Sequence, residues 1–90
     1  MMAVIKDPVA VLDYLFDWSE WLAGDGDTIA NHNVTVPSGI TMNFSSRTTT
    51  AVTVWISGGV VGQTYEIDCH ITTAGGRQDS RKMEMHVMDK

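Results

Sequence analysis

The chain has 90 residues and a formal net charge of −5, with 43% hydrophobic and 19% charged residues. This composition fits one globular domain and excludes a disordered chain. The acidic balance argues against a nucleic-acid-binding protein, because phosphate recognition needs a basic surface. The local basic cluster of Arg77, Arg81 and Lys82 is interleaved with Asp79 and Glu84, so it does not form such a surface.

The cysteine count and the hydropathy pattern bear on where the chain is made. Cys69 is the single cysteine, so no intramolecular disulfide can form, and we expect synthesis in a reducing cytoplasm. The sequence has no run of about 18 apolar residues, so we expect no membrane-spanning helix. Its first residues lack a basic region followed by an apolar stretch, so we expect no signal peptide.

The first residues form a short segment that ends at Pro8. We expect residues 1–9 to form an N-terminal arm and residues 10–90 to form the folded domain. Such an arm can pair with the sheet edge of a neighbouring molecule, because the edge offers unpaired backbone groups. The candidate interface residues of the arm are Met1, Met2, Val4 and Ile5.

Alternating hydrophobic residues then predict a strand, which is followed by a helical turn. Its apolar face carries Leu12, Tyr14, Phe16 and Trp18, whereas Asp13 and Asp17 fall on the other face. This period of two is typical of a half-buried strand. A helix is the alternative from Trp18 to Leu22, where the apolar residues fit helical spacing, and we expect one helical turn over Ser19–Ala23.

Two further strands are expected in the middle of the chain. The first covers Thr28–Val36, and its alternation breaks around Ala30–Asn33, which indicates a β-bulge. The second follows the turn at Pro37-Ser38-Gly39 and places Ile40, Met42 and Phe44 together on one face.

The second half of the chain has the clearest alternation. A fourth strand has Val52, Val54 and Ile56 on its inner face, which puts Trp55 on the opposite face. The inner faces of the last two strands carry Tyr65, Ile67, Cys69 and Ile71 and then Met83, Met85 and Val87. Between them, Ala74-Gly75-Gly76 is a hairpin signal.

The six or seven expected strands recur at about ten-residue spacing, which indicates an all-β sandwich or barrel. The spacing Gly62-x-x-Tyr65 is typical of a tyrosine corner, in which the hydroxyl group binds a nearby backbone group. In antibody domains the tyrosine lies two residues before a cysteine, but Tyr65 lies four residues before Cys69. The pattern therefore matches the sandwich class and not antibody domains.

No set of residues has the spacing of a catalytic, cofactor or metal site, so we expect neither an enzyme nor a cofactor. Cys69 and His70 are adjacent on a strand and point to opposite faces, which prevents a shared metal. If the last two strands form a hairpin, His70 and His86 can be neighbours on an outer face. Asp25 and Asp27 resemble a fragment of a calcium loop, but its remaining acidic ligands are missing.

Trp55 is the most interesting of the tryptophans, since it lies opposite the inner face of its strand. An exposed tryptophan is a typical interface anchor. Two interpretations stay open: Trp55 contacts another protein, or the chain's own arm or a loop covers it.

Several longer motifs resemble a family of small proteins from tailed bacteriophages and prophages, described as fiber-tail adaptor or neck proteins. They are LDYLFDWSEWL at 12–22, GDTIA at 26–30, VTVPSGIT at 34–41, AVTVWISGG at 51–59, GQTY at 62–65 and ITTAGGRQDSR at 71–81. Together they cover residues from about 8 to 88.

This resemblance implies a virion structural protein with an immunoglobulin-like β-sandwich of about seven antiparallel strands and no catalytic residues. We expect it to join fiber or collar components to the neck or tail, within a symmetric homo-oligomeric ring. The expected partners are other virion proteins, with no nucleic acid and no membrane. A capsid-surface decoration protein and a module that binds host carbohydrate remain alternatives.

Overall fold

The computed structural model describes residues 2–24 and 26–89, and this part of the chain contains seven strands and one short helix. The strands are β1 (Met2–Lys6), β2 (Leu12–Asp17), β3 (Ile29–Thr35), β4 (Ile40–Arg47), β5 (Ala51–Gly58), β6 (Thr64–Thr73) and β7 (Gln78–Val87). The helix α1 (Ser19–Ala23) follows β2, as its sequence predicted. Within the same residues, no helix is long and apolar enough to cross a membrane.

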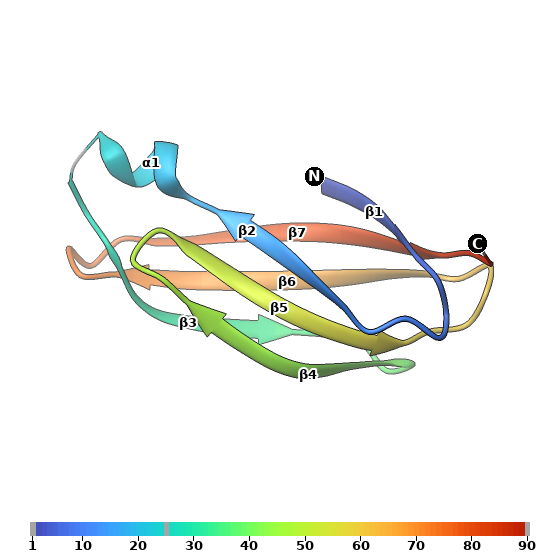
Figure 1. Ribbon diagram of the computed structural model, residues 1–90. Coiled ribbons are helices and arrows are strands. Elements are labelled where there is room, and N and C mark those ends of the chain that lie inside the picture. Colours follow the sequence, from blue (N-terminus) through green and yellow to red (C-terminus); the bar gives the residue numbers. More distant parts are fainter. Residues whose placement is uncertain (1, 25, 90) are drawn as a thin grey trace.

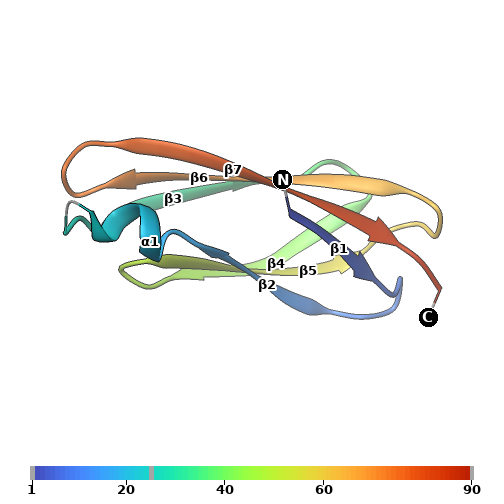
Figure 2. The ribbon, with the colours of Figure 1, turned by 90° about the horizontal axis from the view of Figure 1, so that it is seen from above.

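The strands form two sheets that pack face to face, which confirms the expected β-sandwich (Figures 1 and 2). One sheet has the order β1-β7-β6-β3, and the other has the order β2-β5-β4. All neighbouring strands are antiparallel except β1 and β7, which are parallel. The sandwich is elongated, with extents of 42 × 19 × 16 Å.

The core lies between the two sheets and follows the sequence alternation. Every second residue of β6 from Tyr65 to Ile71 is buried, and the facing strand β5 buries Val52, Val54 and Ile56. Each fully buried aliphatic side chain stabilises the fold by about 1.5–3 kcal/mol relative to an exposed position.

Trp18 closes the core at the α1 end of the sandwich. It is completely buried, and its ring stacks on that of Phe16 with 6.1 Å between centroids. Its Nε1 donates a hydrogen bond of 2.8 Å to Oδ2 of Asp79 on β7. The helix then places Leu22 in the core, so the helical turn covers this end of the core with an apolar side chain.

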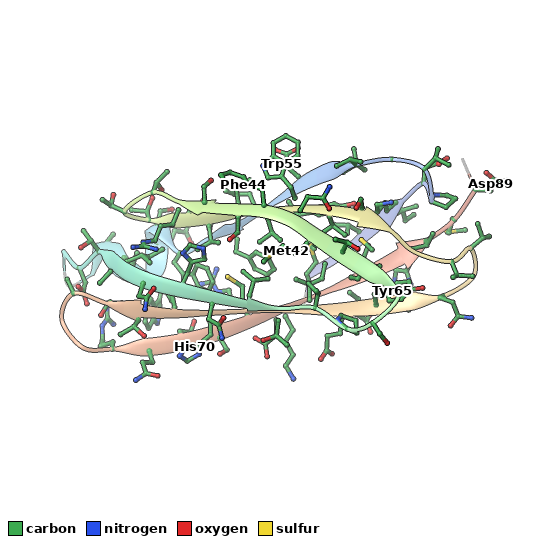
Figure 3. All side chains as sticks on the ribbon, turned by 90° about the horizontal axis from the view of Figure 1, so that it is seen from below. Met42, Phe44, Trp55, Tyr65, His70 and Asp89 are labelled. Carbon is green, nitrogen blue, oxygen red and sulfur yellow. The ribbon has the colours of Figure 1, made fainter. Side chains whose placement is uncertain are left out.

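Tyr65 occupies the opposite end of the sandwich (Figure 3). Its hydroxyl oxygen accepts a hydrogen bond of 3.0 Å from the backbone N–H of Val60, which is the contact that the Gly62-x-x-Tyr65 spacing predicted. The ring packs so closely on Gly39 that an added Cβ would lie 2.9 Å from its Cε1 atom. Gly39 also has a φ of 100°, which favours glycine.

The segment expected to be a free arm is part of the chain's own sheet. β1 pairs with β7 from Met2 opposite Met83 to Lys6 opposite Val87. Lys6 is completely buried, and its Nζ donates hydrogen bonds of 2.8 Å to the carbonyl oxygens of Asp7 and Gly58. Burial lowers the pKa of Lys6, while the Asp7 carboxylate partly opposes this shift. The strand was missed because a lysine stands where the alternation calls for an apolar side chain.

The bulge expected in the strand before Pro37 is confirmed. The pairing of β3 with β6 shifts between Ile29 and Asn31, and regular register resumes with Asn31 opposite Thr72 and His32 opposite Ile71. The inward-facing His32 then reaches across to the edge of the other sheet, where its Nε2 lies 3.1 Å from the hydroxyl oxygen of Ser45.

Candidate docking surface

Trp55 lies on the outer face of the three-stranded sheet, as the sequence predicted. Its strand neighbours Val54 and Ile56 are completely buried, whereas Trp55 itself is 37% exposed. The inward direction of these neighbours turns the indole ring away from the core. The ring therefore points outward from β5 (Figure 3).

Phe44 on β4 lies directly opposite Trp55 and is 59% exposed. The sequence placed Phe44 on the same face as Ile40 and Met42, and this prediction was wrong. The register of β4 against β5 shifts between Met42 and Phe44, so an extra residue turns Phe44 to the outer face. Figure 3 shows the result, with Met42 between the sheets and Phe44 beside Trp55 on the outside.

β2 completes this surface on the other side of Trp55. Asp13 is the cross-strand partner of Trp55, and both residues are exposed on the outer face. Leu15, two residues further along β2, is 54% exposed. We call the surface formed by Asp13, Leu15, Phe44 and Trp55 the aromatic face.

The outer face of the four-stranded sheet has a different chemistry. His70 lies there, on the opposite side of the molecule from Trp55 (Figure 3). Its ring nitrogens lie 2.6 Å from the Ser80 hydroxyl oxygen and 2.9 Å from Oε1 of Gln78. Polar side chains that bind one another in this way suit contact with water, so the aromatic face is the better candidate for docking.

The other candidate interface residues lie on or near β1. Val4 is half-buried and packs against the core, so it stabilises this chain's own fold. Ile5 is 48% exposed. The backbone of Met2 pairs with Met83, and Met1 lies outside the described residues.

Among the described residues, no group of three or more His, Cys, Asp or Glu side chains could hold a metal ion. His70 and His86 lie on one face but are not neighbours, because the hairpin register sets His70 opposite Ser80 and His86 opposite Thr64.

Cys69 is completely buried. Burial raises the pKa of its thiol to about 12, and the Asp68 carboxylate adds to the rise, so the thiol stays protonated at neutral pH.

The Asp27 carboxylate joins two parts of the chain through hydrogen bonds. Its Oδ1 accepts hydrogen bonds from the backbone N–H groups of Thr28 at 2.9 Å and Gly75 at 3.0 Å. The hydrogen bond from the Thr73 side chain is the largest cause that lowers the pKa of Asp27. These bonds tie the start of β3 to the turn between β6 and β7. Asp25 lies outside the described residues.

Two arginines of the basic cluster, one just before β7 and one within it, contact tryptophans of the same chain. The Arg77 guanidinium lies 4.2 Å from the ring centroid of Trp21, and Arg81 lies 4.8 Å from that of Trp18. Each arginine thus covers a tryptophan at the α1 end of the sandwich. The two arginines are therefore part of the packing around α1.

The sequence alone identified Trp55 but missed Phe44, Asp13 and Leu15 as its neighbours. Leu15 lies between Tyr14 and Phe16, whose side chains face the core. Because side chains alternate along a strand, these neighbours were the signal that could have placed Leu15 on the outer face of the sheet. Asp13 was placed on the outer face, but its pairing with Trp55 depends on a strand register that the sequence does not contain.

A comparison with protein-family models identifies the family of the chain. The model described as podophage GP4 fiber-tail adaptor protein gp77 matches residues 6–86. This range covers most of the 90 residues and includes every strand from β2 to β6. A search of curated proteins gave no match. The family model nevertheless agrees with the resemblance seen in the sequence motifs, and the chain belongs to the podophage GP4 fiber-tail adaptor family.

Proposed function

We propose that this chain is a non-enzymatic structural protein of a tailed-phage virion, made in the host cytoplasm, which joins fiber or collar components to the neck or tail. The observation that carries the proposal is the match of a fiber-tail adaptor family model over residues 6–86. A joining role needs surfaces that other proteins can contact. The aromatic face offers one, with Phe44 and Trp55 exposed side by side.

The chemistry of the described residues supports a structural role. A nucleophilic thiol needs a lowered pKa, but the pKa of Cys69 is raised to about 12. His32 is held between Ser45 and Arg47, which occupy both of its ring nitrogens.

Ring formation is the finer part of the proposal. β1 is an outer strand of its sheet, so its second edge has no strand partner among residues 2–24 and 26–89. Unpaired edges of this kind can accept a strand from another molecule. Contacts along β1, which includes the exposed Ile5, would link copies into a closed ring.

An immunoglobulin-like topology also belongs to the proposal. The order β2-β5-β4 in one sheet and β7-β6-β3 in the other is that of the common strands of immunoglobulin domains. The hydrogen bond from the Val60 N–H to the Tyr65 hydroxyl supports it further, as this is the contact of a tyrosine corner.

A carbohydrate-binding module is the second candidate, because paired aromatic rings beside a carboxylate can stack on and bind a sugar. Trp55, Phe44 and Asp13 provide these groups. A glycan array probed with the purified chain tests this candidate. Binding that Trp55→Ala abolishes would favour it, and no binding to any glycan would remove it.

Quantitative mass spectrometry of purified phage particles, with the major capsid protein as reference, tests the adaptor role. About six to twelve copies per particle are expected for a ring at the neck or tail. Hundreds of copies would instead indicate a capsid decoration protein. Absence of the chain from the particle would contradict every virion role.

A further inference from the structure

Two of the three tryptophans in this chain share one arrangement, in which an arginine covers the indole ring and an aspartate binds the arginine. At Trp18, the Arg81 guanidinium lies 4.8 Å from the ring centroid, and Nε of Arg81 lies 3.8 Å from Oδ2 of Asp79. At Trp21, the Arg77 guanidinium lies 4.2 Å from the centroid, and its Nε lies 3.5 Å from Oδ2 of Asp27. A cation over an aromatic face is stabilised by the ring, and the carboxylate adds a charge-assisted contact.

The third tryptophan has the aspartate but not the arginine. Asp13 lies directly opposite Trp55, and opposed residues of antiparallel strands have Cβ atoms about 4.5–5.5 Å apart. One guanidinium group can therefore contact both side chains. No arginine or lysine within the described residues forms an ion pair with Asp13 or lies over the ring of Trp55.

The lysines and arginines within residues 2–24 and 26–89 of a second copy are poorly suited to supply the missing cation. Arg77 and Arg81 cover tryptophans of their own chain, and Arg47 binds Nδ1 of His32 and the carbonyl oxygen of Ala30. Lys6 is completely buried. The cation of Lys82 lies 3.6 Å from Glu66 on the outer face of the other sheet. If these residues keep their own contacts, self-association through the aromatic face would leave Asp13 desolvated without any of them as a partner, which is costly.

We propose that the aromatic face docks onto a different virion protein, which inserts an arginine between Asp13 and Trp55. Apolar side chains around that arginine cover Phe44 and Leu15, which are 59% and 54% exposed. Arginine is enriched at such interface centres, where it combines a planar charged group with an apolar stem. This proposal rests on the virion role proposed above and specifies the surface and the chemistry of the partner.

Photo-crosslinking in assembled particles tests which molecule covers the aromatic face. The phage lacks its own copy of the gene, and the chain is supplied with p-benzoylphenylalanine in place of Phe44 or, as the control on the polar face, in place of Ser80. We expect the photoreactive residue at position 44 to crosslink to a virion protein of different sequence, at a site next to an arginine of that protein. The control at position 80 should give no crosslink to the same site. Crosslinks only to another copy of this chain, or none at all in particles that contain it, would overturn the proposal.

A charge reversal tests the arginine itself. Asp13→Lys should reduce incorporation of the chain into particles by at least about tenfold, since it places a cation against the partner's arginine. Glu84→Lys makes the same charge change on the polar face, where the side chain is 44% exposed, and should be incorporated normally. Matching urea unfolding curves of both variants would exclude misfolding. Changing the crosslinked arginine to aspartate should restore incorporation of Asp13→Lys, and failure of this rescue would overturn the arginine contact.

These outcomes separate the two proposals. If the unchanged chain is missing from the particle, the virion role itself fails. If the chain is present and Asp13→Lys is incorporated as well as Glu84→Lys, the virion role stands and the assignment of the aromatic face is wrong.

Discussion

The hydroxyl groups of the two tyrosines have opposite surroundings. The Tyr65 hydroxyl accepts a hydrogen bond from the Val60 backbone, which fixes the crossing between β5 and β6. The Tyr14 hydroxyl is buried without a hydrogen-bond partner among the described residues. A buried polar group lowers stability unless it is paired, so the same chemical change at the two positions should have different effects.

Tyr65→Phe should lower the free energy of unfolding by about 1–2 kcal/mol, because the Val60 N–H loses its acceptor. Tyr14→Phe is the matched control, and its stability should be unchanged or raised because an unpaired hydroxyl is removed. Urea unfolding of both variants checks this. Equal losses at the two positions would contradict the role given to the Tyr65 hydroxyl.

His32 links the edges of the two sheets and must be neutral to do so. Its Nδ1 lies 2.9 Å from Nη1 of Arg47, which can only donate, so Nδ1 accepts and Nε2 carries the proton toward Ser45. Burial lowers the pKa of His32, and the positive charge of Arg47 lowers it further. The unfolded chain therefore binds a proton at this site more readily than the folded chain does.

The contribution of neutral His32 to stability should be complete above the unfolded pKa of about 6.5 and should be lost as the pH falls through the lower folded value. Unfolding free energies of the parent chain and of His32→Gln, measured from neutral to acidic pH, check this. The difference between the two proteins should shrink as the pH falls. A constant difference over the whole range would show that protonation of His32 does not weaken the link between the sheets.

At the scale of the element, the bulge in β4 determines that Phe44 lies on the outer face of the three-stranded sheet. Asn43 is the unpaired residue between Met42 opposite Ile56 and Phe44 opposite Trp55. Its Oδ1 accepts a hydrogen bond of 2.7 Å from the Ser57 hydroxyl at an exposed position. Without this extra residue, the two flanking pairs could follow each other in regular register.

Deletion of Asn43 should therefore leave the fold intact and cost about 1 kcal/mol, which is the value of the lost hydrogen bond. Deletion of Thr41 is the control, because it would turn the buried Ile40 toward solvent and cost about 2–3 kcal/mol. Urea unfolding measures both. If the two deletions cost the same, the bulge does not determine the position of Phe44.

Most elements of the fold could be predicted from the sequence, but some features of strand pairing could not. The strands from β2 to β7 and the turn of α1 could be predicted, because their alternation and glycine-rich turns are local signals. The bulge in β3 could be predicted because it interrupts the pattern. The bulge in β4 could not, since the regular spacing of Ile40, Met42 and Phe44 hides it and only the register against β5 reveals it. The pairing of Asp13 with Trp55 was hidden for the same reason.

At the scale of the whole molecule, the sandwich has two unlike outer surfaces. The outer face of the β1-β7-β6-β3 sheet carries polar groups that bind one another, such as His70 with Ser80. The β2-β5-β4 sheet exposes Phe44 and Trp55 beside Asp13. A small domain of this kind is only marginally stable, and large apolar side chains left in water do not contribute to its stability. Exposed apolar patches of this kind mark sites that another molecule covers.

The most direct test of this account is hydroxyl-radical footprinting of the free chain and of purified particles, read out by mass spectrometry at single residues. Trp55 and Phe44 on one face and His70 on the other all react with hydroxyl radicals when exposed. We expect oxidation of Trp55 and Phe44 to fall severalfold in the particle, while oxidation of His70 stays near that of the free chain. Protection of His70 with undiminished oxidation of Trp55 would contradict docking through the aromatic face and would place the partner on the polar face.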